Sequence, residues 1–227
     1  MSSPAENLTT VLTRIRQAER RFQRLPGSVT LLAVSKGQPT ESIAAIAAAG
    51  QRCFGESYLQ EALPKQESLR QFDLEWHFIG PIQANKTRGI ATHFNWVHSV
   101  DRLKIAQRLS EQRPPQLPPL NVCLEVNISQ ESSKHGLSPA ELQAVAHAVA
   151  GLPRLRLRGL MAVPAPCEEF MAQCHQLARL QTLQEELIAA GLDLDTLSMG
   201  MSADLEAAIA EGATLVRVGT AIFGPRT

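Results

Sequence analysis

Short apolar segments and amphipathic helical patterns alternate along the whole chain. Eight apolar runs have the length and composition typical of buried strands. A helix is expected before the first of them, at about residues 7–23, and a helical pattern follows each of the first seven. The expected strands cover residues 29–34, 52–54, 74–79, 96–100, 120–127, 155–161, 196–199 and 215–219.

Residues that favour helix ends stand at the borders of the helical patterns. Four polar residues are expected as N-caps, namely Thr40, Asp101, Ser138 and Ser202. Four glycines are expected to end helices in a left-handed conformation, namely Gly50, Gly151, Gly191 and Gly212. These residues limit the helices to the segments between the strands.

The strict alternation of buried strands and helices implies a parallel sheet. Eight repeats at this length favour an α/β fold with a single (β/α)8 TIM barrel, formed as one domain by residues 1–227. A doubly wound open sheet is the alternative. The leading helix is expected either to cover the barrel bottom or to close the ring of helices.

The charge balance excludes several classes of partner. The 227 residues are 44% hydrophobic, and 22 basic residues balance 22 acidic ones. No net charge therefore attracts the protein to nucleic acid or to an anionic membrane surface. The arginine-rich segment 14–24 is interpreted as the solvated face of an amphipathic helix. A small molecule is the expected partner.

The cysteine and histidine patterns predict no metal site and no disulfide scaffold. The four cysteines form no Cys-x-x-Cys pair, and the six histidines form no His-Glu-x-x-His motif. His93 and His98 are interpreted as ordinary polar residues. The first residues lack the features of a signal peptide, and no apolar run reaches membrane-spanning length. The expectation is a cytoplasmic monomer.

Lys36 stands where the first strand is expected to end, between the apolar run 29–34 and Gly37. A lysine at such a position in a barrel can form a Schiff base with an aldehyde. Loss of hydration lowers the pKa of the amine and leaves more of it neutral and nucleophilic. The alternative is a lysine that extends from a strand end into solvent.

Two glycine-containing loops follow the last two expected strands, where barrels commonly bind phosphate. The first loop is Ser198-Met199-Gly200-Met201-Ser202, and the second begins with Gly219 and Thr220. Glycine allows close approach of the backbone, hydroxyl groups donate hydrogen bonds, and free amides at a helix start attract anions. Either loop alone is commonplace, but their joint position predicts a phosphate site.

Arg217 is expected to point into the barrel, because alternation along its strand places Val216 and Val218 outward against helices. An inward guanidinium stays charged and needs a partner. That partner is either a carboxylate, with Glu125 as the candidate, or a ligand. The lysine, the phosphate loops and the inward arginine together match pyridoxal 5′-phosphate (PLP), an aldehyde on a phosphorylated pyridine ring.

Six segments resemble the pyridoxal phosphate homeostasis protein family, whose barrel is similar to the N-terminal domain of bacterial alanine racemase. They are residues 33–36, 54–56, 76–86, 158–161, 197–204 and 217–224, and the resemblance covers essentially the whole chain. It implies that Lys36 forms the internal aldimine with PLP and that Arg217 faces the pyridine nitrogen. It also implies that Ser202, Gly219 and Thr220 receive the phosphate.

The expected cofactor-binding set includes these residues and neighbours in the matching segments. It consists of Lys36, Ser57, Met161, Ser198, Gly200, Met201, Ser202, Arg217, Gly219 and Thr220. Ser57 departs from the family pattern, which usually has asparagine at this position, and the shorter serine side chain cannot donate an amide hydrogen bond. Among the other lysines, Lys65 and Lys104 are expected on solvated helix faces. Lys86 is expected to open the helix after the third strand and Lys134 to lie in a loop, so both can approach the barrel mouth.

Three functions are compatible with this set. The first is a non-catalytic protein that binds PLP reversibly, buffers it and transfers it to apo-enzymes. The second is an amino-acid racemase or lyase with Lys36 as base, and the third is a Schiff-base aldolase that binds a sugar phosphate. The resemblance favours the first. Arg217 does so too, because a positive charge beside the pyridine nitrogen makes the ring a poorer electron sink. Tyr58 is the only tyrosine, whereas the related racemase uses a tyrosine from another domain for proton transfer.

Overall fold

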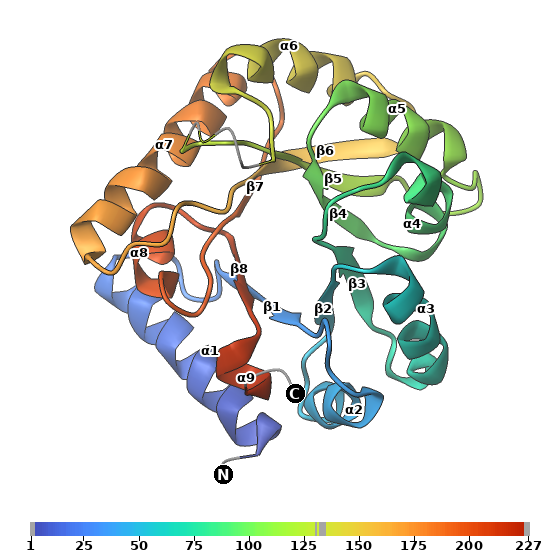
Figure 1. The fold of residues 1–227 in the computed structure, drawn as a ribbon. Coiled ribbons are helices and arrows are strands. Elements are labelled where there is room, and N and C mark those ends of the chain that lie inside the picture. Colours follow the sequence, from blue (N-terminus) through green and yellow to red (C-terminus); the bar gives the residue numbers. More distant parts are fainter. Residues whose placement is uncertain (1–2, 130, 132–134, 225–227) are drawn as a thin grey trace.

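In the computed structural model, which describes residues 3–129, 131 and 135–224, eight strands form a closed barrel (Figure 1). Every neighbouring pair is parallel, including β1 with β8. The expected TIM barrel is confirmed, and the alternative of an open sheet is wrong. The strands are β1 (Thr30–Val34), β2 (Cys53–Glu56), β3 (Glu75–Phe78), β4 (Trp96–Val100), β5 (Leu120–Glu125), β6 (Leu155–Met161), β7 (Thr196–Ser198) and β8 (Leu215–Val218).

Helices surround the barrel (Figure 1). α1 lies on the outside beside α8 and α9, so it closes the ring of helices and does not cover the barrel bottom. Among the described residues, no helix combines the length and apolar content that a bilayer crossing requires. The helices are α1 (Pro4–Arg21), α2 (Thr40–Ala48), α3 (Leu59–Ser68), α4 (Thr87–His93), α5 (Leu103–Gln112), α6 (Pro139–Ala150), α7 (Phe170–Ala189), α8 (Leu205–Ala210) and α9 (Thr220–Phe223), with short 3₁₀ helices η1 (Arg70–Phe72) and η2 (Ala84–Lys86).

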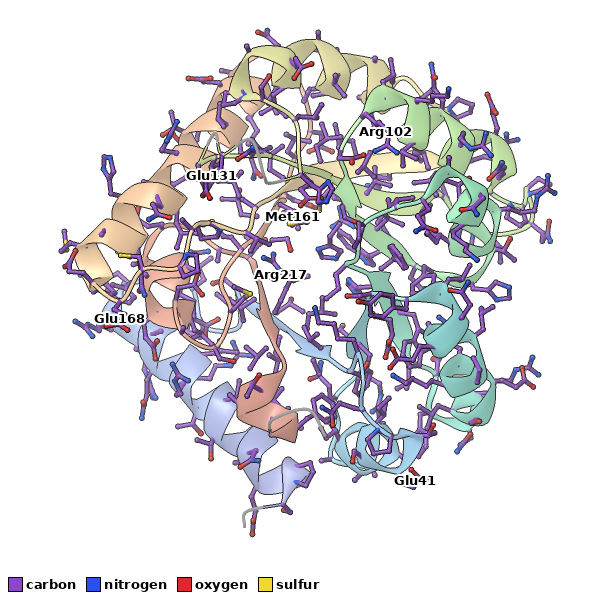
Figure 2. The ribbon with its side chains drawn as sticks, in the orientation of Figure 1. Glu41, Arg102, Glu131, Met161, Glu168 and Arg217 are labelled. Atoms are coloured by element: carbon purple, nitrogen blue, oxygen red, sulfur yellow. The ribbon has the colours of Figure 1, made fainter. Side chains whose placement is uncertain are left out.

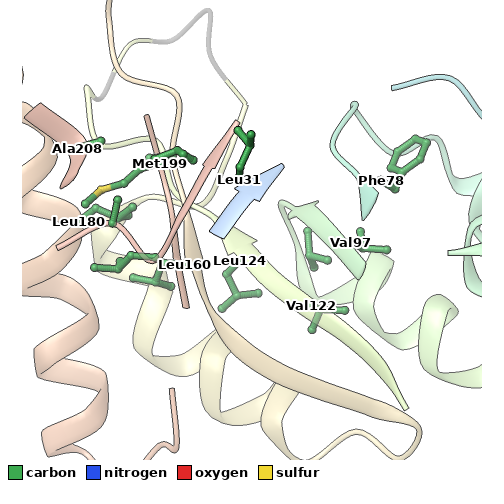
Figure 3. Packing of buried hydrophobic residues seen from close by; sticks show 14 of the residues in the cluster. Leu31, Phe78, Val97, Val122, Leu124, Leu160, Leu180, Met199 and Ala208 are labelled. Atoms are coloured by element: carbon green, nitrogen blue, oxygen red, sulfur yellow. The ribbon is translucent and has the colours of Figure 1, made fainter. Parts of the chain in front are cut away.

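Side chains at alternate strand positions pack outward against the helices and form the main core (Figure 3). Leu31, Val97 and Leu124 on the strands belong to the same buried cluster as Leu180 on α7 and Ala208 on α8. The positions between them face the inside of the barrel. That interior contains the small buried cluster Trp96, Cys123 and Met161 together with the buried polar side chains His77, His98, Ser198 and Arg217. The interior is therefore unusually polar for a barrel core.

The arginine-rich segment 14–24 is only partly solvated, so the expectation of a solvated helix face is wrong for some of its arginines. Arg14 forms an ion pair of 2.9 Å with Glu206 on α8. Arg24 donates hydrogen bonds to the carbonyl oxygens of Ile209 (3.0 Å) and Ala213 (3.2 Å). These contacts fix the leading helix against the end of α8. Arg20 and Arg21 are exposed as expected.

Helix caps agree with the sequence only in part. Ser138 caps α6 in a capping box with Glu141, whereas the other three expected N-caps are wrong, since α2, α5 and α8 are preceded by Pro39, Arg102 and Asp204. The N-cap of α8 is Asp204 and not Ser202, because residues 202–204 form one more turn before the helix begins. Gly50, Gly191 and Gly212 have the expected positive φ of 104°, 95° and 90°, but Gly151 has a right-handed φ of −81°.

Glu19 is a buried carboxylate that fixes the start of β1 to α1. It accepts hydrogen bonds from the amides of Gly27 (3.1 Å) and Val29 (2.9 Å) and from Arg16 Nη1 (2.7 Å). Burial acts to raise the pKa of Glu19, but these donors outweigh it and the pKa is lowered.

Replacing Glu19 with alanine is expected to lower the free energy of unfolding by about 2–3 kcal/mol at pH 7, because two amides lose a charged acceptor. Because the pKa of Glu19 is lowered in the folded state, its contribution to the free energy of unfolding is fully present above its ordinary pKa of 4.5. That contribution is lost as pH falls through the lower pKa of the folded state. Urea denaturation between pH 3 and 7 measures both effects. The exposed Glu41 on α2 provides the control, since Glu41→Ala should change stability by less than about 0.5 kcal/mol.

Candidate functional site

The carboxyl ends of β6, β7, β8 and β1 lie side by side on one part of the barrel rim (Figure 1). In the strand pairing, Met161 lies opposite Ser198, and Val218 lies opposite Ala33. Most of the expected site residues stand on or directly after these four strand ends. The carboxyl ends of the strands are where (β/α)8 barrels hold their ligands.

Lys36 lies in the turn after β1, two residues beyond the strand end, and its side chain is partly buried. Gly37 follows with a φ of 72°, a left-handed conformation that glycine adopts without strain. The amide of Gln38 donates to the carbonyl oxygen of Ser35 at 3.0 Å and closes the turn. The backbone of Lys36 is therefore held in one conformation at the barrel mouth.

Lys65 on α3 is buried beside this turn, so the expectation of a solvated lysine is wrong. Its Nζ donates hydrogen bonds to Glu56 Oε1 (2.8 Å), Glu61 Oε1 (2.5 Å) and the carbonyl oxygen of Ser35 (2.9 Å). Lys65 and Glu56 are 6% and 0% exposed, respectively, so this ion pair is shielded from water. Lys104, in contrast, is exposed as expected.

The two carboxylates that bind Lys65 also hold the chain on both sides of Lys36. Ser35 Oγ donates to Glu56 Oε1 at 2.7 Å, and the amide of Gly37 donates to Glu61 Oε1 at 2.5 Å. Burial raises the pKa of Glu56 despite the hydrogen bonds from Lys65 and Ser35. The Glu56–Lys65–Glu61 cluster is thus a buried support for the Lys36 turn.

The two expected phosphate loops approach neighbouring elements closely at their glycines. Gly200 has a φ of 94°, and an added Cβ would lie 2.5 Å from Cβ of Ala208. At Gly219 an added Cβ would lie 3.2 Å from the carbonyl oxygen of Val34, two residues before Lys36. Glycine is therefore required by the packing at Gly200, and Gly219 brings the β8 loop against the strand that carries Lys36.

Several backbone amides of these loops are available to an anion. The amides of Ser202, Thr220 and Ala221 donate to no acceptor among the described residues. The amide of Met201 differs, because it donates to Asp204 Oδ1 at 2.6 Å. Free amides beside hydroxyl groups are the donor set that a phosphate requires. The loops therefore fit a phosphate group through Ser202, Thr220 and Ala221.

Arg217 points into the barrel, as the alternation predicts, and it lies in the central region in Figure 2. Its Nη1 donates to the carbonyl oxygen (2.5 Å) and Oγ (2.8 Å) of Ser198, and its Nη2 donates to the carbonyl oxygen of Ala162 (2.9 Å). Within the described chain no carboxylate forms an ion pair with it, so Glu125 is not its partner. The Nε–H is not used by any described residue, which leaves a donor for a ligand.

The charge of Arg217 is maintained at neutral pH. Burial lowers its pKa to about 10, and the negative charges of Asp204 and Glu125 act in the opposite direction. A guanidinium with this pKa is protonated at pH 7. It can donate to a ligand nitrogen but cannot accept a proton from it.

Ser57 and Met161 stand apart from the phosphate loops, whereas Met201 lies in the first of them. Ser57 borders a separate cavity of about 390 Å³ near Tyr58 and Lys86, on the β2–β3 side of the mouth. Met201 is 40% exposed and lines an apolar groove of about 610 Å³ along residues 163–168. Met161 is 2% exposed and packs inside the barrel with Trp96 and Cys123 (Figure 2). Lys134 lies outside the described residues.

Sequence reasoning missed two buried histidines, one that contacts Ser198 of the site and one that contacts the first histidine. His98 was interpreted as an ordinary polar residue, but it is fully buried, and its Nδ1 lies 2.7 Å from Ser198 Oγ. His77 is also buried and lies 2.8 Å from His98. Strand alternation could have identified both, because it places His77 between the outward Trp76 and Phe78.

The sequence matches a known family model and curated relatives over almost its entire length. Residues 7–227 match the family described as "Alanine racemase, N-terminal domain". The chain is 62% identical over 226 residues to the pyridoxal phosphate homeostasis protein of Pseudomonas aeruginosa, covering 100% of this chain and 97% of that protein. It is 52% identical over 229 residues to the protein of the same name from Escherichia coli, covering 100% and 98% of the two chains.

Solved structures extend the comparison to the fold. PipY of Synechococcus elongatus, solved with PLP bound, is 38% identical, with a TM-score of 0.85 and coverage of 98% of this chain and 100% of that chain. Alanine racemase from Corynebacterium glutamicum is 19% identical, with a TM-score of 0.70 over 94% of this chain and 62% of that chain, so it supports the barrel fold alone. The chain therefore belongs to the pyridoxal phosphate homeostasis protein family, which is built on the alanine racemase N-terminal barrel.

Proposed function

We propose that this protein binds PLP reversibly through Lys36 and serves PLP homeostasis inside the cell as a carrier and buffer without turnover. One observation carries the proposal. Lys36, the free amides of the two glycine loops and the unused donor of Arg217 occupy adjacent strand ends of one barrel rim. These groups match the aldehyde, the phosphate and the ring nitrogen of PLP. The names of the relatives and the PLP bound to PipY support the same ligand.

Each group has a separate role in this proposal. The hydroxyl of Ser202 and the amides of Thr220 and Ala221 bind the phosphate, while Gly219 lets the backbone come close to it. The Arg217 Nε–H donates to the ring nitrogen. Lys36 would hold the cofactor covalently, because its neutral amine would condense reversibly with the aldehyde, whose oxygen leaves as water. When bound, PLP supplies an electrophilic carbon and a ring that can accept electrons.

In the described part of the chain, the groups around such a site suit storage better than racemisation. Arg217 is charged and disfavours protonation of the ring nitrogen, which weakens the ring as an electron sink. Tyr58, the only tyrosine, is 62% exposed and lies after β2, on the other side of β1 from the phosphate loops. Two-base racemisation needs a base on one face of the substrate carbon to remove the proton and an acid on the other face to deliver one. The arrangement therefore favours storage and release over turnover.

In its cellular setting, the protein acts in the cytoplasm as a monomer, with residues 1–227 as one cofactor-binding domain. Its partners are PLP and, transiently, apo-enzymes that take up the cofactor. Ser57, Met161, Ser198, Gly200 and Met201 complete the surroundings of the cofactor, with Ser198 acting through Arg217.

Borohydride trapping is the direct test of the site. The wild-type protein is expected to develop a visible absorption band with PLP, to lose it on reduction, and to carry one label on the peptide that contains Lys36. The label forms there because the phosphate loops hold the aldehyde next to this amine. Peptide mass spectrometry locates the modification. A label on Lys86 or Lys134 instead would refute the assignment.

A second assay separates the carrier from the alternative of a racemase or lyase. PLP-loaded protein is incubated with an apo-enzyme while free PLP is trapped, and recovery of enzyme activity measures transfer. Conversion of L-alanine to D-alanine is followed with the same preparation. Transfer without conversion supports the carrier. Efficient multiple turnover of an amino acid would establish an enzyme in its place.

A further inference from the structure

Five side chains form a continuous hydrogen-bonded path through the inside of the barrel. Glu75, the first residue of β3, borders a cavity of about 290 Å³ at the amino-terminal opening. Its Oε1 lies 2.9 Å from His77 Nε2, and His77 Nδ1 lies 2.8 Å from His98 Nε2. His98 Nδ1 lies 2.7 Å from Ser198 Oγ, which is 2.8 Å from Arg217 Nη1. The path therefore joins the far end of the barrel to the arginine of the proposed PLP site.

The ionised Glu75 at one end, Arg217 at the other and two neutral histidines between them fix the direction of every hydrogen bond. Arg217 can only donate, so Ser198 Oγ accepts from it, and because each neutral histidine has one donor and one acceptor, the Ser198 hydroxyl donates to His98 Nδ1. His98 then carries its proton on Nε2 and donates to His77 Nδ1. His77 in turn carries its proton on Nε2 and donates to Glu75, whose carboxylate can only accept. Each side chain thus has one defined tautomer or rotamer.

Burial keeps both histidines neutral, as this directed path requires. His77 and His98 are 1% and 0% exposed. Burial lowers the pKa of both histidines; for His98 the positive charge of Arg217 lowers it further, whereas for His77 the hydrogen bond to Glu75 acts in the opposite direction without outweighing burial. Glu75 is ionised at neutral pH, since the hydrogen bond from His77 lowers its pKa despite partial burial. Two neutral imidazoles therefore connect a buried guanidinium with a partly exposed carboxylate.

We propose that Glu75 is a positioning residue for the PLP site, acting through His77, His98 and Ser198 on Arg217. By accepting from His77, Glu75 selects the tautomers along the path, so that the Ser198 hydroxyl donates to His98 and its oxygen accepts from Arg217 alone. Without this acceptor, His77 can carry its proton on Nδ1, where it would face the N–H of His98. His98 must then reverse and donate from Nδ1, so Ser198 Oγ accepts from both His98 and Arg217, and the Ser198 hydroxyl hydrogen loses its acceptor in the path.

The tautomers can be measured in the protein prepared without PLP. In a ¹⁵N-histidine-labelled sample at pH 7, ring-nitrogen chemical shifts distinguish protonated from unprotonated nitrogens. His77→Gln and His98→Gln assign the two residues by loss of their signals. Both histidines are expected to be neutral, with the proton on Nε2. A proton on Nδ1 of either residue, or an imidazolium, would overturn the directed path.

A matched pair of variants tests the role of Glu75. The substitution Glu75→Gln keeps a carbonyl acceptor at this position, so the tautomers should persist and PLP affinity should stay within about twofold of wild type. Glu75→Leu leaves His77 Nε2 facing the cavity, where water can donate or accept, so mixed tautomers and a loss of PLP affinity of about 3- to 10-fold are expected.

The outcomes separate this inference from the proposed function on which it rests. If a folded Glu75→Leu protein kept the wild-type tautomers and PLP affinity, the positioning role of Glu75 would be overturned. If that variant does not fold, the histidine spectrum of the wild-type protein still decides whether the path exists. Expected tautomers in a wild-type protein that binds no PLP would refute the proposed function and the role of Glu75 toward PLP, while the path itself would stand.

Discussion

Replacing Lys65 with methionine is expected to lower the free energy of unfolding by about 3–5 kcal/mol at pH 8, because the variant leaves the buried carboxylate of Glu56 without its cation. The penalty should decrease as pH falls, since Glu56 already has a raised pKa and its protonation removes the buried charge. Guanidinium denaturation of the wild type and the variant at pH 5 and pH 8 measures both effects. The Lys36 turn should also loosen, since Lys65 bonds to the carbonyl oxygen of Ser35 and to Glu61, which holds Gly37.

Lys104→Met is the matched control for this prediction, because it removes the same charge from an exposed position on α5 and should change stability by less than about 0.5 kcal/mol. The double variant Glu56→Gln with Lys65→Met should recover part of the loss, since no unpaired charge then remains. Equal effects of Lys65→Met and Lys104→Met would show that the Lys65 ion pair does not stabilise the fold.

Strand positions were the most predictable part of the structure. The expected segments 96–100 and 155–161 coincide with β4 and β6, and the other six strands differ by one or two residues at their ends. Strands buried on both faces form continuous apolar runs between turn residues, so local sequence alone marks them. Their number and their alternation with helices then determine the closed barrel.

Helix caps and buried charges were harder to predict, because both depend on how loops and strands pack in three dimensions. Asp204 caps α8 in place of Ser202, since the loop after β7 continues two residues further before the helix begins. Lys65 follows a helical pattern that is typical of a solvated lysine. Its burial depends on Glu56, which comes from a neighbouring strand. No local pattern in the sequence contains that pairing.

The candidate site could be outlined from sequence but not completed. The position of Lys36 at a strand end and the inward direction of Arg217 follow from strand register, and the structure agrees with both. The partner of Arg217 does not follow from it, because Ser198 reaches the guanidinium from another strand. His98 escaped notice for the same reason. Its role depends on a residue 100 positions away in sequence.

Replacing Lys36 with alanine is expected to abolish the visible absorption band and the borohydride label, and to weaken PLP binding by about 100-fold or more, equivalent to about 2.7 kcal/mol. The covalent bond is lost, but the amides of Thr220 and Ala221 and the Ser202 hydroxyl still recognise the phosphate. Lys86→Ala, at the other side of the mouth, should retain the band and the affinity of the wild type. Absorption spectra and equilibrium titration with PLP measure these effects.

Comparing PLP with pyridoxal, which lacks the phosphate, separates the covalent bond from the phosphate site. Wild-type protein should bind pyridoxal weakly through Lys36, and Lys36→Ala should bind it no better than an unrelated protein. Residual binding of PLP by Lys36→Ala, competed by inorganic phosphate, would locate the remaining affinity in the β7 and β8 loops. If Lys36→Ala retained the band, another amine would be the point of attachment. If it bound PLP and pyridoxal equally, these loops would not be the phosphate site. A carrier needs both interactions, because the phosphate contacts select PLP while the reversible bond to Lys36 sets how long it stays.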